Sequence, residues 1–455
     1  MRLVERWRAI DPAWQFAIGA FLIARVALTL WSLLVARLLS PQVQNLDLFG
    51  APVLATFDLT TSERYTYSRE LDGRVLTFRL ADASHVTDAQ TSSVWSLRDG
   101  RAIAGAYAGG ALTPSSYRVE DIFPYHGVAA ETNSLLAPWQ RFDTNWYLKI
   151  AQRGYAGDDG STVYFPLYPA LIGLAGGSLL AALVVSNLAL IGALYLLYRL
   201  GAAIADPAAA RRAVAYLLLF PTGFFLLAAY TESLFLFFTL GAFLCAARTR
   251  WFLAGLFGAL AALTRLQGVL IIMPLAFIVW REIEQVRRTD DLPIVDCVLR
   301  FIPLVLIPLA TVAFLAFTNF SLLTNYAGQL HARFVFPWEN LAASVELLAS
   351  GQGGPIDALN LLTTLGLGAL LIAVWLQLPR EYGLFAFLMY LAPLFRMTTA
   401  QPLVSMARYT LAIFPVFFLW GKWGKNAWVN RAVTYLSTPL QLYLSAQFVM
   451  WGWVG

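Results

Sequence analysis

The residues best suited to chemistry lie in one short segment, from Arg141 to Tyr155, where an aspartate stands among aromatic side chains. Asp143 is followed by Trp146 and Tyr147, and Tyr155 closes the segment. A carboxylate can take the proton of an attacking hydroxyl group that lies within hydrogen-bonding distance. The rings are suited to stacking on a sugar or a prenyl chain, although anchoring at a membrane interface is their commoner use. The segment therefore favours group transfer to an alcohol.

The spacing of Trp146, Ile150, Ala151 and Tyr155 gives one apolar helical face. We expect a helix that lies along an interface and begins near Asp143. At that position the aspartate could serve only as a helix cap. An acid at the mouth of a membrane cavity is also a functional candidate by default. Both interpretations stay open at this point.

Other polar residues gather where apolar runs end. Glu232, in Tyr230-Thr231-Glu232-Ser233, is either a helix cap or a residue that positions an acceptor. Arg265, Arg333 and Arg408 are each suited to snorkelling toward lipid headgroups, or together to holding a phosphate group. Tyr409 follows Arg408 directly and is a candidate for substrate contact.

Two adjacent acids, Asp158 and Asp159, precede Gly160. They could bind a divalent cation through carboxylate oxygens, but a solvated turn is the commoner reason for such a pair. The three histidines have no metal-ligand spacing, and the sequence contains no Walker-type phosphate loop. We therefore expect neither a metal nor a nucleotide cofactor. The net charge of +5 does not indicate a nucleic-acid partner, because the basic residues stand mostly at the ends of apolar runs.

The composition is that of a membrane protein. Of the 455 residues, 59% are hydrophobic and 13% are charged, with a mean hydropathy of +0.63. A soluble domain normally has about a quarter charged residues. Apolar runs that reach the roughly 20 residues needed to cross a bilayer recur along the chain. We predict an all-α polytopic protein with eleven transmembrane helices, near residues 14–39, 178–200, 211–228, 231–247, 251–264, 266–281, 301–320, 358–378, 383–396, 407–421 and 431–451.

Lysine and arginine residues concentrate at alternate ends of these runs, which predicts a cytoplasmic N-terminus and an extracytoplasmic C-terminus. This orientation places the Asp143 segment, Glu232 and the candidate arginines on the extracytoplasmic face of the plasma (inner) membrane. The run at 165–176 is interrupted by Pro166, Pro169 and Gly176 and is too short to span, so we expect a surface or re-entrant helix there.

The loop after the first apolar run alternates apolar and polar residues, as in Arg74 to Leu80, and it contains the turn dipeptides Asp72-Gly73 and Asp99-Gly100. We expect a small β-rich extracytoplasmic insert. The predicted segments are 1–44 (tail and first span), 45–140 (insert), 141–177 (catalytic outer loop and juxtamembrane helices) and 178–455 (transmembrane bundle).

The motifs also resemble a known family. Arg141-Phe142-Asp143, Trp146-Tyr147 and Gly154-Tyr155, followed by Phe165-Pro166-Leu167-Tyr168-Pro169, resemble the bacterial branch of the PIG-V-like mannosyltransferases. That family belongs to the GT-C superfamily of polytopic glycosyltransferases. Thr264-Arg265-x-x-Gly268 and Ala407-Arg408-Tyr409 fit the same pattern in the same order.

The resemblance implies a polyprenyl-phosphate sugar donor, usually mannose, and a lipid, glycan or protein acceptor. It implies direct inverting transfer with Asp143 as the general base and with no metal. Two departures are Phe142, where the family usually has tryptophan, and the long insert. The alternatives are a lipid or sugar transporter or flippase, which commonly shows internal repeats that are not evident here, and an inactive scaffold that binds a lipid-linked sugar.

Overall fold

The computed structural model describes residues 10–48, 50–59, 62–117, 122–287, 294–328, 332–398 and 401–454. The chain is mostly helical and has a small β region near its N-terminus. It divides into two compact units. The bundle unit comprises Met1–Val26, Ile150–Leu444 and Val454–Gly455, and the β unit comprises Ala27–Lys149 and Ser445–Trp453.

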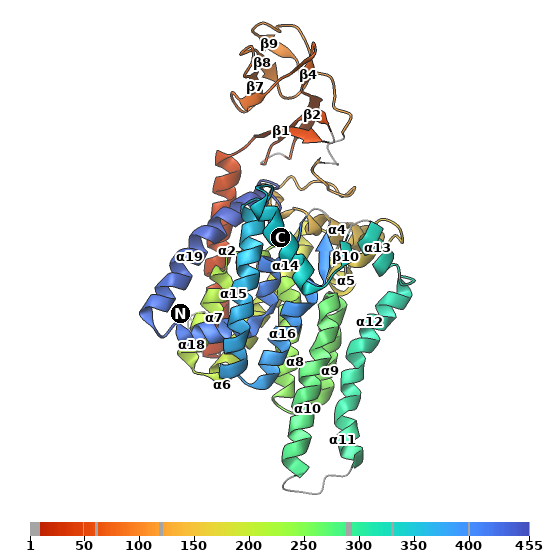
Figure 1. Cartoon of the computed structure of the whole chain (residues 1–455), viewed down its shortest axis with the longest axis vertical. Coiled ribbons are helices and arrows are strands. Elements are labelled where there is room, and N and C mark those ends of the chain that lie inside the picture. Colours follow the sequence, from red (N-terminus) through yellow and green to blue (C-terminus); the bar gives the residue numbers. More distant parts are fainter. Residues whose placement is uncertain are drawn as a thin grey trace. The chain divides into compact units, whose positions relative to one another are not determined.

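The bundle unit is built from helices that are joined by short connections (Figure 1). Within it, α8 packs against both α6 and α9, α12 packs against α9, and α7 packs against α6 and α18. Its elements are α5 (Leu167–Leu174), α6 (Leu179–Ile204), α7 (Pro207–Leu219), α8 (Glu232–Ala246), α9 (Trp251–Thr264), α10 (Ile272–Arg287), α11 (Ile294–Phe301), α12 (Leu306–Phe317), α13 (Leu322–Gly328), α14 (Pro337–Ala349), α15 (Pro355–Gln377), α16 (Arg380–Leu394), α17 (Met406–Tyr409) and α18 (Phe414–Trp423), with 3-10 turns η2 (Ser161–Val163), η3 (Gly223–Leu226), η4 (Leu266–Ile271), η5 (Ile302–Val305) and η6 (Thr410–Ala412).

Three further helices cross the division between the units: α2 (Pro12–Leu38), α4 (Asp143–Arg153) and α19 (Ala427–Val449). Among the described residues, five helical stretches are long and apolar enough to cross a membrane. They are Pro12–Leu38, Leu179–Ile204, Leu266–Arg287, Val298–Phe317 and Pro355–Gln377.

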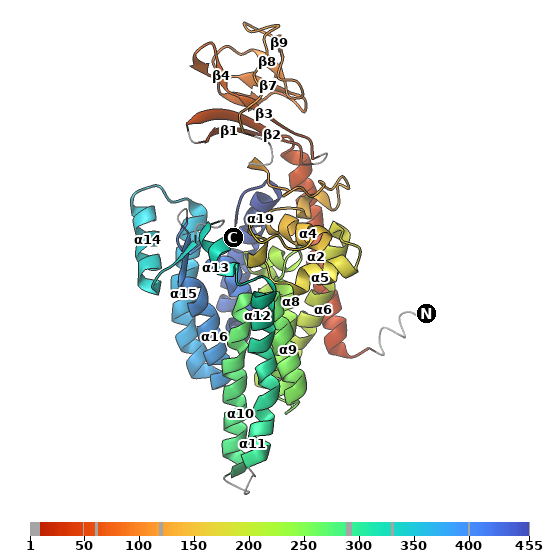
Figure 2. The same cartoon turned by 90° about the vertical axis from the view of Figure 1, so that its right-hand side faces the viewer.

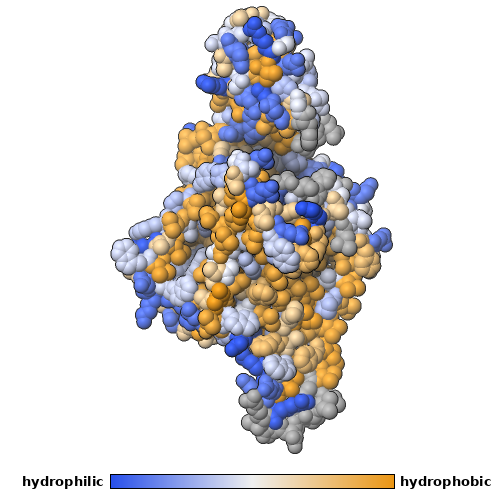
Figure 3. Space-filling model, viewed as in Figure 1, coloured by the Kyte–Doolittle hydropathy of each residue, from blue (hydrophilic) through white to orange (hydrophobic). Residues whose placement is uncertain are grey.

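Large apolar side chains on these stretches face outward, such as Ile23, Leu188 and Leu376, which is unusual for a soluble surface. Hydrophobic residues cover much of the helical surface in Figure 3. The helices therefore indicate a membrane protein. Other predicted runs correspond to shorter helices, such as α16 and α18, or to α19, which is not among the five stretches, so the count of eleven spans and the orientation stay predictions.

The β unit contains a three-stranded antiparallel sheet in the order β1-β2-β3, a four-stranded antiparallel sheet in the order β6-β7-β8-β9, and a short β4-β5 hairpin (Figure 2). The strands are β1 (Gln42–Leu48), β2 (Ala51–Phe57), β3 (Arg64–Ser68), β4 (Glu70–Leu71), β5 (Arg74–Val75), β6 (Phe78–Leu80), β7 (His85–Asp88), β8 (Val94–Ser96) and β9 (Ala102–Ala104). The β-rich part thus ends well before residue 140, where the predicted insert ends.

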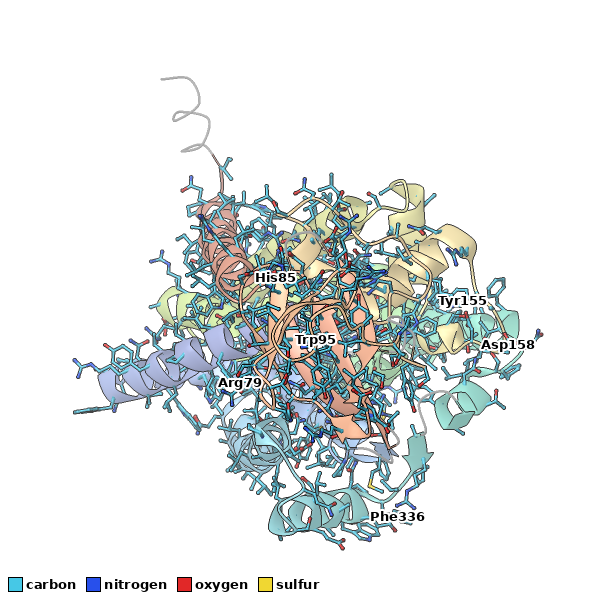
Figure 4. The ribbon with its side chains drawn as sticks, turned by 90° about the horizontal axis from the view of Figure 1, so that it is seen from above. Arg79, His85, Trp95, Tyr155, Asp158 and Phe336 are labelled. Atoms are coloured by element: carbon cyan, nitrogen blue, oxygen red, sulfur yellow. The ribbon has the colours of Figure 1, made fainter. Side chains whose placement is uncertain are left out.

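The core of the strand region forms around Trp95, which is fully buried and is labelled among the strands in Figure 4. Its indole Nε1 donates a hydrogen bond to Asp88 Oδ2 over 3.0 Å, and its ring meets Phe78 edge-on. The β unit also includes the C-terminal segment Ser445–Trp453. This grouping differs from the sequence prediction, which places that segment with the helical bundle.

Candidate functional site

Between α7 and α8 the backbone of the bundle unit leaves the helical path for twelve residues, and it is buried throughout. Away from water, the carbonyl groups of such a segment must find donors inside the protein. Gln441 Nε2 donates to the carbonyl oxygen of Leu218, in the last turn of α7, over 2.6 Å and to that of Phe220, the first residue of the segment, over 3.2 Å. Arg25 Nη1 donates to that of Leu227 over 2.9 Å. Side chains from separate helices therefore fix the segment that leads to Glu232.

Glu232 is the first residue of α8, and its side chain is only 1% exposed. Its Oε1 accepts a hydrogen bond from Arg265 Nη2 and lies 3.2 Å from Arg408 Nε. Its Oε2 is buried and has no hydrogen-bond partner in the described parts of the chain. Thr231, at the cap position of α8, makes no side-chain cap hydrogen bond there. Glu232 is therefore the centre of a buried ionic cluster, with one oxygen available to accept a further hydrogen bond.

Arg265 is positioned by a tight turn where α9 meets η4. A Cβ atom at Gly268 would lie 2.5 Å from the backbone of Ala261, so only glycine fits this close approach. The turn leaves Arg265 in an extended conformation at the end of α9. Its Nε donates to Thr231 Oγ1 over 2.8 Å. The glycine of the Thr264-Arg265-x-x-Gly268 motif therefore determines where the guanidinium group lies.

Arg408 lies in α17, whose backbone is held by side chains from two other elements. Asn360 Oδ1 accepts a hydrogen bond from the Ala407 amide over 3.1 Å, and Thr222 Oγ1 donates to the Ala407 carbonyl over 2.8 Å. The Arg408 guanidinium lies 5.5 Å from the ring centre of Tyr230, within cation–π range. Two guanidinium groups and one carboxylate leave the cluster with one positive charge in excess.

A hollow of about 780 Å³ opens beside this cluster. Its wall is mainly apolar, with Arg333, Arg396, Tyr326 and Tyr409 among its polar members. Arg333 lies on strand β10 (Ala332–Phe334), which pairs in antiparallel fashion with β11 (Arg396–Thr398). The other lining residues are Leu266, Gln267, Val269, Leu270, Ala327, Ala332, Phe334, Leu388, Leu391, Ala392, Pro393 and Phe395.

The arginines of the hollow differ in their surroundings. Arg333 is exposed, whereas Arg396 is partly buried and its guanidinium lies 5.8 Å from the ring centre of Tyr326. Burial raises the pKa of the Tyr326 phenol above its ordinary value, so the hydroxyl is protonated at neutral pH and can donate a hydrogen bond. The hollow therefore offers cationic groups and a hydroxyl donor at one part of an apolar wall.

A second, much smaller cavity of about 10 Å³ shares Gln267, Pro393 and Tyr409 with the hollow and is also lined by Arg265. Its size suits about one water molecule. The Tyr409 ring lies 6.0 Å from the Arg265 guanidinium and 5.9 Å from that of Arg408. Tyr409 thus connects the hollow with the ionic cluster.

In the β unit, Asp143 is the first residue of α4 and is half-buried. The next two residues, Thr144 and Asn145, are fully buried, and their side chains donate hydrogen bonds to backbone carbonyls. The Trp146 ring faces His126 at 4.0 Å, and Tyr147 is buried. Asp143 is therefore at a helix start, as predicted, and it is more exposed than the polar residues that follow it.

Tyr155 and the diacid belong to the bundle unit and have local partners (Figure 4). The Tyr155 hydroxyl donates to the Tyr164 carbonyl over 2.8 Å, and its ring packs on Phe314. Asp159 Oδ1 accepts a hydrogen bond from the Ser161 amide, next to Asp158 in the same loop. Within the residues that the structure describes, no three His, Cys, Asp or Glu side chains lie together as metal ligands would.

The structure thus brings together Glu232, Arg265, Arg408 and Tyr409, and it places Arg333 with Tyr409 around the hollow. Sequence reasoning missed Arg396 and Tyr326. The signal for Arg396 was weak: a single arginine at the end of an apolar run. No known family model, curated protein or solved structure matches this chain.

Proposed function

We propose that this protein is a membrane glycosyltransferase. In this proposal it moves a sugar, mannose, from a polyprenyl-phosphate donor to an acceptor hydroxyl on the extracytoplasmic side, with inversion. The observation that supports it most strongly is the apolar hollow with Arg333 and Arg396 in its wall. A lipid-linked phosphate has the same two parts, a long apolar chain and an anionic group.

The dimensions and chemistry of the hollow suit the donor. Its volume of about 780 Å³ lies in the range of small-molecule sites. Guanidinium groups form charge-assisted hydrogen bonds with phosphate oxygens, and the apolar wall suits a prenyl chain. We therefore assign the binding of the donor phosphate to Arg333 and Arg396.

Arg265 and Arg408 stabilise the same phosphate group in a different way. Both are held by Glu232, which compensates only one of their two charges. The remaining positive charge lies beside Tyr409, a residue that lines the hollow. A preorganised positive charge stabilises the negative charge that develops on a leaving phosphate. The uncommitted Oε2 of Glu232 is available to accept a hydrogen bond from a substrate hydroxyl.

Asp143 is the proposed general base. Its carboxylate takes the proton of the acceptor hydroxyl, whose oxygen bonds to the anomeric carbon. The bond from that carbon to the phosphate oxygen breaks, its electron pair stays on the phosphate, and polyprenyl phosphate leaves. Trp146, half-exposed next to the base, is assigned to sugar stacking. Tyr147 and Tyr155 are assigned to packing, because Tyr147 is buried and the Tyr155 hydroxyl is hydrogen-bonded to Tyr164.

The test is to incubate the purified protein with labelled polyprenyl-phosphate mannose and a lipid or glycan extract, and to measure the transferred label. Arg333→Ala and Arg396→Ala should each raise the KM for the donor. Arg380→Ala is the matched control, because Arg380 is an exposed arginine at the start of α16, away from the hollow. If all three variants behave alike, the phosphate binds elsewhere.

A transporter or flippase is the second candidate, and one observation favours it. Twelve buried residues outside the α-helices join α7 to α8, and unwound backbone of this kind lines the substrate sites of many secondary transporters. The labelled donor separates the two functions. Transfer of the sugar to a new product supports the enzyme, whereas movement of intact donor across vesicles that contain the protein, without a product, supports the transporter.

A further inference from the structure

Arg141, two residues before the proposed base, is a fully buried cation. Its Nε donates to the carbonyl of Val449 over 2.9 Å, and its Nη1 donates to those of Ala137 and Gln140 over 2.7 and 3.0 Å. Burial lowers its pKa to about 10, so the group is still charged at neutral pH. The segment that leads into α4 is therefore tied by one hydrogen bond to a residue 308 positions further along the chain.

Aromatic rings from the C-terminal segment complete this attachment. The Arg141 guanidinium lies 5.0 Å from the ring centre of Trp451. The Phe142 ring lies 5.3 Å from Trp451, 5.0 Å from Trp453 and 5.9 Å from Phe448. All these residues belong to the β unit. Phe142 is thus enclosed by rings that come from the last residues of the chain.

The backbone explains why Phe142 needs this support. Its φ angle is +48°, in the left-handed region that a bulky side chain rarely adopts. Such a conformation persists only where the surrounding structure over-determines it. Asp143 is the next residue, so the direction of its side chain depends on the Phe142 conformation.

We propose that the C-terminal segment Ser445–Trp453 is a positioning element for Asp143. Trp451 and Trp453 hold the left-handed turn at Phe142 and so fix the start of α4. The inference deepens the glycosyl-transfer proposal and rests on it for its consequence in catalysis. The structural part, that the C-terminal rings hold residues 141–147, is independent of what the enzyme transfers.

The test uses the full-length protein with Trp453→Ala, the conservative Trp453→Phe and the control Trp428→Ala. Trp428 is a tryptophan of α19 that is 75% exposed. Two quantities are measured: amide hydrogen exchange of residues 141–147, and transfer kinetics. Trp453→Ala should speed the exchange and lower kcat by up to about 100-fold with an unchanged KM for the donor, because a misplaced catalytic group loses rate more than binding. Trp453→Phe should have an exchange rate and a kcat near those of the wild type, and Trp428→Ala should change neither quantity.

Unchanged exchange at residues 141–147 in Trp453→Ala would overturn the positioning role, whatever the activity. A rise in KM with kcat unchanged would also overturn it. If the wild-type protein transfers no sugar, the transfer proposal fails, while the exchange data still decide whether the C-terminal rings hold the turn. If Trp453→Ala does not fold, Trp453→Leu, which keeps an apolar side chain and removes the aromatic ring, replaces it under the same criteria.

Discussion

Glu232 has two buried arginines around a single carboxylate, so its loss would leave two guanidinium groups uncompensated. Removing one partner of a buried ion pair costs about 3 kcal/mol or more. We predict that Glu232→Gln lowers the free energy of unfolding by about 3 kcal/mol. Thermal unfolding in detergent checks this, with Glu346→Gln on the exposed face of α14 as the control. Equal midpoints for both variants would show that the cluster contributes little to stability.

Asp88 gives the β unit a defined response to acid. Burial acts to raise its pKa, but hydrogen bonds from Trp95, Thr91 and Ser93 outweigh burial and hold the pKa below its ordinary value. A carboxyl group whose pKa is lower in the folded state stabilises the fold when it is ionised. This stabilisation is fully present above the unfolded-state pKa of about 3.9, and it is lost as the pH falls through the lower pKa of the folded state.

We therefore predict that Asp88→Asn exposes residues 85–97 to hydrogen exchange at pH 7. The difference in exchange rate between Asp88→Asn and the wild type should narrow as the pH falls below about 4. Over that range the wild-type carboxyl group also becomes uncharged, because it takes up a proton. Exchange rates at these residues, corrected for the intrinsic effect of pH, provide the measurement. A difference that stays constant down to about pH 2 would contradict the role of the Asp88 charge.

At the scale of elements, the irregular stretch between α7 and α8 depends on donors from distant helices. Gln441 donates to the Phe220 carbonyl of this stretch and to the Leu218 carbonyl in the last turn of α7, and each buried carbonyl left without a partner costs about 1–3 kcal/mol. Gln441→Met, which keeps the volume and removes the donor, should therefore lower stability by at least about 2 kcal/mol. Gln152→Met, at an exposed glutamine, is the control for the thermal unfolding measurement. A shift no larger than that of the control would mean that other groups satisfy these carbonyls.

The helices and strands were largely predictable, because periodicity is a local property. A helix that starts at Asp143 and the β-rich segment around residues 74–97 both followed from spacing and turn residues. The ionic cluster was not predictable, because Glu232 and Arg265 are 33 residues apart and meet only where α8 packs on α9. Arg396 lines the hollow where the end of α16 meets β10, a strand more than 60 residues earlier in the chain. The enclosure of Phe142 by Trp451 and Trp453 likewise depends on tertiary packing.

At the scale of the whole molecule, the predicted orientation places the strands on the extracytoplasmic side of the membrane and the end of α10 on the cytoplasmic side. With the native cysteines replaced, Ser84→Cys, at an exposed position between β6 and β7, should react with a membrane-impermeant thiol reagent in right-side-out vesicles. Gln285→Cys, at the end of α10, should react only in inside-out vesicles. The opposite pattern would reverse the orientation and would move the proposed chemistry to the cytoplasmic face.

The whole account depends on Asp143 acting as a base, and one comparison tests this most directly. Single-turnover transfer from labelled polyprenyl-phosphate mannose is measured for the wild type, for Asp143→Asn and for Asp159→Asn, whose carboxylate accepts a hydrogen bond from the Ser161 amide of its own loop. We predict that Asp143→Asn binds the donor normally but transfers at least about 100-fold more slowly, the usual contribution of general base catalysis, while Asp159→Asn transfers at the wild-type rate. Near-normal transfer by Asp143→Asn would contradict the account.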